Sequence, residues 1–118
     1  MELGIYRLKV ENEIIGFLRV EQNQYFYSKN GHRWSGKKLE FEYYERFTGF
    51  KDRNDKRIFE GDIVSSTIYT EDEYIIYYDQ PLKKFLLVSY ENRTTFNCSL
   101  NEFFKEKHVV TRVGFLLR

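Results

Sequence analysis

Short runs of alternating apolar and polar residues recur along this chain, and turn-forming residues separate them at intervals of about ten residues. The clearest run, residues 37–45 (KKLEFEYYE), puts apolar and aromatic side chains on one face and mostly charged ones on the other. This period of two is typical of a half-buried antiparallel strand. Aromatic residues make up 19% of the chain and alanine is absent, a composition that favours strands over helices. We therefore predict a mainly β fold.

The pattern predicts successive short strands and one helix. The strands are expected at residues 3–10, 13–20, 24–29, 32–34, 37–45, 62–69, 74–78, 83–90, 94–98 and 108–118. Asn30-Gly31 predicts a type I′ hairpin turn between two aromatic strands. Ser99 and Glu102 match a capping box, with Cys98 and Phe103 as its hydrophobic staple, so a two-turn helix is predicted near residues 100–107. The expected architecture is a small antiparallel barrel or pseudo-barrel, and 118 residues suit a single domain.

Charge and cysteine content indicate where the protein acts. The net charge is +1, and we read acids and bases as interleaved along the whole chain, which gives no long-range field toward nucleic acid or membrane. Cys98 is the single cysteine, so no internal disulfide can form. No signal peptide is seen at the N-terminus, and no apolar stretch approaches the roughly 20 residues of a membrane span. We expect a cytoplasmic protein without membrane contact.

Residues 47–64 (FTGFKDRNDKRIFEGDIV) contain two turns rich in acidic side chains. One interpretation makes Asp52, Glu60 and Asp62 a carboxylate cluster for a metal or for the acid–base chemistry of a hydrolase. The other makes them turn and capping residues, and it is favoured because the spacing fails the EF-hand template.

Metal and nucleophile patterns are lacking elsewhere in the sequence. His32 and His108 have no other ligand type at metal spacing, and Cys98 fits a buried apolar position. We expect no catalytic residue, metal or cofactor, and therefore no enzyme.

The same segment resembles the hallmark of the YopX family of phage and prophage proteins, a pattern close to TGLKDKNGKEIYEGDIV. The residues that we select as the family motif are Thr48, Gly49, Asp52, Asn54, Glu60, Gly61 and Asp62. Asp55 stands where the family usually has Gly, which predicts a type I rather than a type I′ turn. The resemblance covers the chain from Tyr43 on, so we expect a division of the single domain into an N-terminal β subdomain, residues 1–46, and a YopX-like β subdomain, residues 47–118. It implies a mostly β fold and a phage or prophage origin, and no activity.

Aromatic and basic residues meet around Asn30-Gly31. Tyr25, Tyr27, Arg33 and Trp34 are the candidate binding surface, with Phe26, Lys29 and His32 between them. Such a set can stack bases and contact phosphates, but the rings can equally belong to the core, and the composition favours the core. The leading hypothesis is a non-enzymatic accessory protein that binds another protein, with self-association as an addition; nucleic-acid binding is the alternative. An SH3-like barrel is a further analogy.

Overall fold

The computed structural model describes residues 1–66, 73–89, 95–99 and 110–115 of the chain. Ten strands and no helix are found in these residues, and all the strand pairs with a recorded register are antiparallel. The prediction of a mainly β fold is therefore confirmed, whereas the helix predicted near residues 100–107 lies outside the described residues. The contacts divide the chain into two units between Phe47 and Thr48. Each unit is described by itself below.

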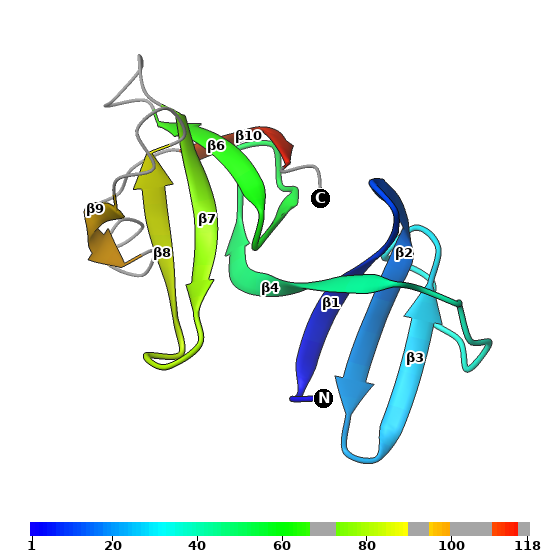
Figure 1. Ribbon diagram of the computed structural model, residues 1–118. Helices are drawn as coiled ribbons and strands as arrows, with labels where there is room; N and C mark the ends of the chain where they lie inside the picture. The colour runs from blue at the N-terminus through cyan, green and yellow to red at the C-terminus, as the bar shows by residue number, and fades with distance from the viewer. Residues whose placement is uncertain (67–72, 90–94, 100–109, 116–118) are drawn as a thin grey trace. The chain divides into compact units, whose positions relative to one another are not determined.

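The first unit is a sheet of three complete strands and the first half of a fourth. Its strands are β1 (Gly4–Val10), β2 (Glu13–Glu21), β3 (Gln24–Ser28) and the start of β4 (Tyr43–Lys51), in the order β3-β2-β1-β4 (Figure 1). Two-residue turns join β1 to β2 and β2 to β3. Alternate side chains of β1 and β2 point to one face, where they form a core. The core residues are Tyr6, Leu8, Leu18 and Val20.

The connection from β3 to β4 crosses that core. Because β3 and β4 lie on opposite sides of the β1–β2 pair, residues 29–42 must pass from one side of the sheet to the other. Leu39 and Phe41 pack against the core on the way, although neither belongs to a strand. The end of β3 and the crossover both approach β2 so closely that a Cβ added at Gly16 would lie 2.6 Å from the Ser28 carbonyl oxygen and 2.6 Å from Leu39 Cδ1.

This crossover corrects two predicted strands. The alternation at residues 37–45 is real, but only the residues from Tyr43 on form a strand, because β1 pairs with β4 there. Residues 37–42 owe their alternation to covering the core rather than to a sheet. Residues 32–34 are also not a strand. In the described part of this segment, β3 pairs with the following residues only through one isolated bridge, between Tyr27 and Ser35.

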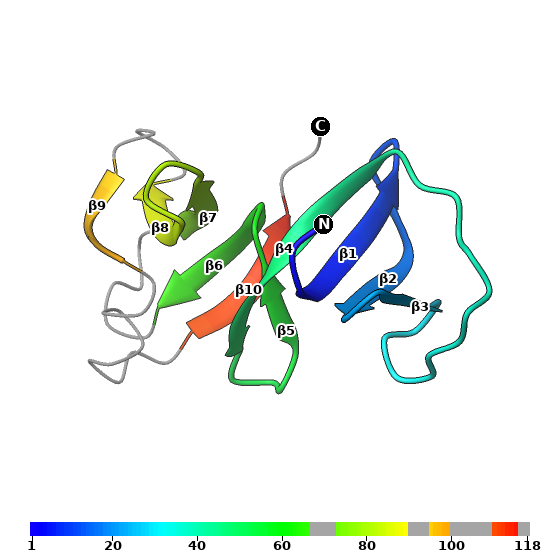
Figure 2. The same cartoon turned by 90° about the horizontal axis from the view of Figure 1, so that it is seen from below.

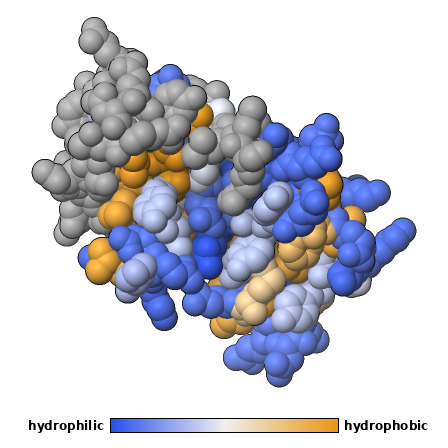
Figure 3. All heavy atoms as spheres, viewed as in Figure 1, coloured by the Kyte–Doolittle hydropathy of each residue, from blue (hydrophilic) through white to orange (hydrophobic). Residues whose placement is uncertain are grey.

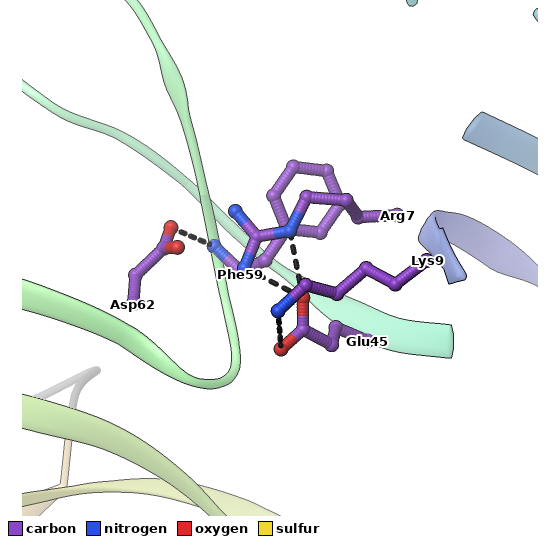
Figure 4. Close-up of polar contacts among 5 residues, drawn as sticks. All are labelled: Arg7, Lys9, Glu45, Phe59 and Asp62. Atoms are coloured by element: carbon purple, nitrogen blue, oxygen red, sulfur yellow. Dashed lines mark hydrogen bonds and ion pairs between the residues drawn. The ribbon is translucent and has the colours of Figure 1, made fainter. Parts of the chain in front are cut away.

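The opposite face of β1 carries a buried ionic triad, which the sequence analysis missed. Arg7 Nη2 lies 2.7 Å from Glu45 Oε1, and Lys9 Nζ lies 3.5 Å from Glu45 Oε2. Arg7 Nε also donates to Glu45 Oε1 at 2.8 Å. The three side chains point toward one another (Figure 4) and are at most 1% exposed. The opposite charges of the triad are therefore paired with one another in a buried position.

The second unit comprises the described residues from Thr48 on. The second half of β4 forms a hairpin with β5 (Arg57–Phe59). A further sheet has the order β10-β6-β7-β8-β9, in which β10 lies beside β6 (Figure 2). Its strands are β6 (Asp62–Ser66), β7 (Glu73–Asp79), β8 (Lys84–Ser89), β9 (Thr95–Ser99) and β10 (Val110–Phe115). The core of this unit consists of Ile58, Val64, Tyr74, Ile76 and Leu87.

The strand order found in the described residues is linear rather than cyclic. The predicted barrel, and its SH3-like variant, are therefore not confirmed and stay predictions. The same holds for the subdomain boundaries predicted at residues 46 and 47.

Candidate functional site

The loop that follows β3 is held by hydrogen bonds from its own polar side chains. Ser28 Oγ accepts from the Gly31 amide at 2.8 Å. Asn30 Oδ1 accepts from the amides of His32 and Arg33 at 2.8 and 3.0 Å. These short side chains close a turn on the backbone, which is their usual role in loops. The predicted type I′ turn is wrong, because Gly31 adopts a positive φ of 83° and Asn30 does not.

Two backbone hydrogen bonds close the base of the loop. The Tyr27 amide donates to the Ser35 carbonyl at 2.7 Å, and the Ser35 amide donates to the Tyr27 carbonyl at 2.9 Å. The seven residues between Tyr27 and Ser35 therefore form a closed loop whose backbone is fixed at both ends.

This loop and the start of the crossover line an open pocket of about 300 Å³. The pocket is lined by Tyr27, Ser28, Lys29, Asn30, Arg33, Ser35, Lys37 and Leu39. Tyr27 and Leu39 are half-buried and pack against the core of the unit, so they form a firm apolar wall. Lys29, Arg33 and Lys37 are exposed cations. No acidic side chain lines the pocket, so its chemistry suits an anionic ligand with an apolar part.

The sequence around the pocket is strongly basic, contrary to our interpretation that charges are interleaved throughout. No acidic residue stands between Glu21 and Glu40, whereas Lys29, Arg33, Lys37 and Lys38 lie there. This stretch therefore carries +4 in a chain whose net charge is +1, so the rest of the chain carries −3. A balanced total charge had hidden a local excess, and counting charge along the chain could have found it.

The structure separates the four residues of the candidate binding surface. Tyr27 and Arg33 line the pocket, but Tyr25 and Trp34 do not. Trp34 and Phe26 lie on the opposite side of the β3 edge, where the Arg19 guanidinium is 5.0 Å from the Trp34 ring centre and 4.9 Å from that of Phe26. These cation–π contacts occupy both rings within the protein itself. Lys37 and Leu39 are pocket residues that the sequence analysis did not select.

The carboxylates of the 47–64 motif bind the backbone of their own turns. Asp52 Oδ1 accepts from the amides of Asn54 and Lys56 at 2.8 and 3.0 Å. Asp62 Oδ2 accepts from the Phe59 amide at 2.8 Å (Figure 4), across the turn Glu60-Gly61. These bonds account for Asp52 and Asp62 as turn residues. Among the described residues, no group of three His, Cys, Asp or Glu side chains lies close enough to hold a metal ion.

Thr48 and Gly49 serve the hairpin between β4 and β5. Thr48 Oγ1 donates to the Ile58 carbonyl at 2.8 Å, which ties the two strands together. Gly49 has a φ of 89°, a backbone conformation that residues with a side chain rarely adopt. The Asp55 amide donates to the Asp52 carbonyl at 3.0 Å, and Asp55 itself has a φ of 62°. Residues 53 and 54, between Asp52 and Asp55, have no positive φ. The loop is therefore a type I turn followed by a left-handed residue, Asp55, at a position that Gly usually occupies.

The comparison with protein families decides which family this chain belongs to. The family model described as "YopX protein" matches residues 9–112. The chain belongs to the YopX family. The YopX match begins well before Tyr43, where the resemblance had been expected to start, and it includes the whole pocket segment. No curated protein and no solved structure matches the chain. In the described part of the chain, no helix is long and apolar enough to span a membrane.

Proposed function

We propose that this YopX-family protein is a non-enzymatic accessory protein of a phage or prophage, and that it binds nucleic acid in the host cytoplasm. The observation that carries this proposal is the pocket of the first unit. Its three cations, Lys29, Arg33 and Lys37, line it together with the apolar wall of Tyr27 and Leu39, and no acidic side chain lines it. Phosphate groups are the anionic part of such a ligand, and contacts from Lys and Arg supply most of the sequence-independent affinity of nucleic-acid-binding proteins. Family membership supports the phage origin.

The non-enzymatic part of the proposal is supported by the motif carboxylates. Asp52 and Asp62, the two most buried of the three acids considered for catalysis, each accept hydrogen bonds from backbone amides of their own turns. A general base or metal ligand needs an oxygen directed at a substrate or ion. The local bonds explain why these residues are acidic without invoking a reaction.

Salt dependence tests the nucleic-acid proposal. If the three pocket cations each contact a phosphate of a single strand, log K should fall with log[salt] with a slope of about −2, since each contact contributes about −0.7. We expect Arg33→Ala and Lys37→Ala each to reduce that slope by about 0.7. Lys38→Ala is the matched control, because Lys38 is adjacent in sequence, 64% exposed and outside the pocket lining. Absence of binding to a short oligodeoxythymidylate at low salt would refute the proposal.

A protein partner is the second candidate, and exposed apolar side chains favour it. Tyr25, Tyr77 and Leu82 are 49%, 54% and 60% exposed. On the described part of the face in Figure 3, apolar residues form separate patches among polar ones, as on a surface with small contact areas. A partner captured with tagged protein should be lost when Tyr77 and Leu82 are both changed to Ser. Self-association is tested by light scattering, where a monomer at high concentration would exclude it.

A further inference from the structure

We infer that the pocket accepts one unstacked nucleotide of a single strand, with its base against Tyr27 and Leu39 and its flanking phosphates on the surrounding cations. This inference rests on the proposed nucleic-acid binding and specifies its substrate class. Of the two rings that the sequence suggested for stacking, it keeps Tyr27 and leaves out Trp34.

The size and walls of the pocket indicate a single base. A volume of about 300 Å³ lies at the lower end of the range for small-ligand pockets, which suits one flat ring system rather than a base pair. Tyr27 presents an aromatic ring and Leu39 an aliphatic side chain, and both are backed by the core. Aromatic rings that stack bases do so without regard to sequence, because every base has a π face. A duplex keeps its bases paired and stacked, so it cannot place one there without unpairing.

The cations are arranged around this wall by a preformed loop. Lys29 and Arg33 lie within the closed loop between Tyr27 and Ser35, whose inner amides are bound by Ser28 and Asn30. Lys37 follows two residues after the closing bridge. Little backbone ordering is then needed on binding, which lowers the entropic cost of association. The backbone that carries Lys29 and Arg33 is thus fixed beside the wall of Tyr27 and Leu39, and Lys37 lines the same pocket.

The second aromatic group of this unit does not compete for the base. Phe26 and Trp34 already stack on Arg19, and Arg19 Nε lies 3.1 Å from Glu21 Oε1. The acidic Glu21 beside this stack would repel a phosphate. The stack of Arg19, Phe26 and Trp34 therefore packs within the protein, and Tyr27 is the aromatic ring that lines the pocket.

The test compares ligands of similar charge that differ in their bases. Binding of labelled short oligodeoxythymidylate to the full chain is measured by fluorescence anisotropy, with an abasic strand of equal length, a duplex, polyphosphate and polyglutamate as competitors. We expect the base-containing strand to bind roughly tenfold more tightly than the abasic strand, as one stacked base provides. The duplex and both simple polyanions should compete weakly.

The outcomes separate this inference from the proposed function. Equal affinity for the base-containing and abasic strands would overturn the base pocket while leaving phosphate binding intact. Stronger competition by polyglutamate than by the oligonucleotide would indicate an acidic protein ligand and overturn both. On the protein side, Tyr27→Phe should keep the preference for bases and Tyr27→Leu should remove it. The ligand-side comparison with wild-type protein stays decisive even if Tyr27→Leu unfolds the unit.

Discussion

Gly16→Ala is the substitution that the geometry of the first unit constrains most sharply. The added Cβ would lie 2.6 Å from the Ser28 carbonyl oxygen and from Leu39 Cδ1, closer than carbon atoms approach in folded proteins. The leucine can rotate, but the carbonyl belongs to backbone that is fixed by the pairing of Ser28 with Phe17. Forcing an extra methyl group into a packed site costs about 1–3 kcal/mol. We expect the free energy of unfolding to fall by that amount.

Urea unfolding followed by the fluorescence of Trp34, the single tryptophan, measures this change in the unit concerned. With a urea dependence of about 1–3 kcal/mol per molar, the midpoint should fall by about 1 M. Gly4→Ala is the matched control, because Gly4 has a φ of 146°, against 158° for Gly16, but no atom lies within 4 Å of its added Cβ, so it should lose less stability than Gly16→Ala. Since Ser28 and Leu39 also line the pocket, Gly16→Ala should weaken oligonucleotide binding. Equal stabilities of the two variants would refute the close packing of the crossover.

Substitutions at three further positions, Glu45, Asp55 and Asp52, test the buried and turn residues by urea unfolding. Glu45→Gln should lower the free energy of unfolding by about 3 kcal/mol, because it leaves Arg7 and Lys9 buried beside a neutral group. The control is Glu21→Gln, in an exposed ion pair, which should lower it by less than about 1 kcal/mol. Equal losses in the two variants would contradict the burial of the triad. At the left-handed position 55, Asp55→Gly should be more stable than Asp55→Ala by about 1 kcal/mol, and the reverse order would exclude the positive φ. Asp52→Ala should lose about 1–2 kcal/mol, whereas Asp52→Asn should keep most of the stability through its remaining oxygen; a large loss in Asp52→Asn would show that the negative charge itself is needed.

Local patterns predicted the local features of this fold. Alternation along β1, β2 and β3, and the turns between them, follow from side-chain periodicity and from turn residues that need no distant partner. The acids of the motif were interpreted as turn residues for the same reason. The Asp55 turn is of type I as predicted, but the reason given for it was wrong, because Asp55 itself adopts the left-handed conformation that Asp was expected to avoid.

Features that depend on distant residues were not predictable in this way. Residues 37–42 alternate like a strand, but the sheet order makes them a crossover, and no local pattern distinguishes the two. Arg7 and Lys9 occupy positions that a half-buried strand would expose, and Glu45, the carboxylate that pairs with them there, is far away in the sequence. The pocket was found only in part, because Lys37 joins Tyr27 through the closing bridge at Ser35. Trp34, selected for its ring, faces the other side.

An NMR titration of the isotope-labelled protein with a short oligodeoxythymidylate tests nucleic-acid binding at the pocket most directly. The backbone amides report on each position separately, so the measurement locates the ligand as well as detecting it. We expect chemical-shift changes at the amides of residues 27–39, where the pocket lies, and their loss in Arg33→Ala combined with Lys37→Ala. No change in this segment, or changes confined to residues after Thr48, would contradict the assignment of the pocket as the binding site.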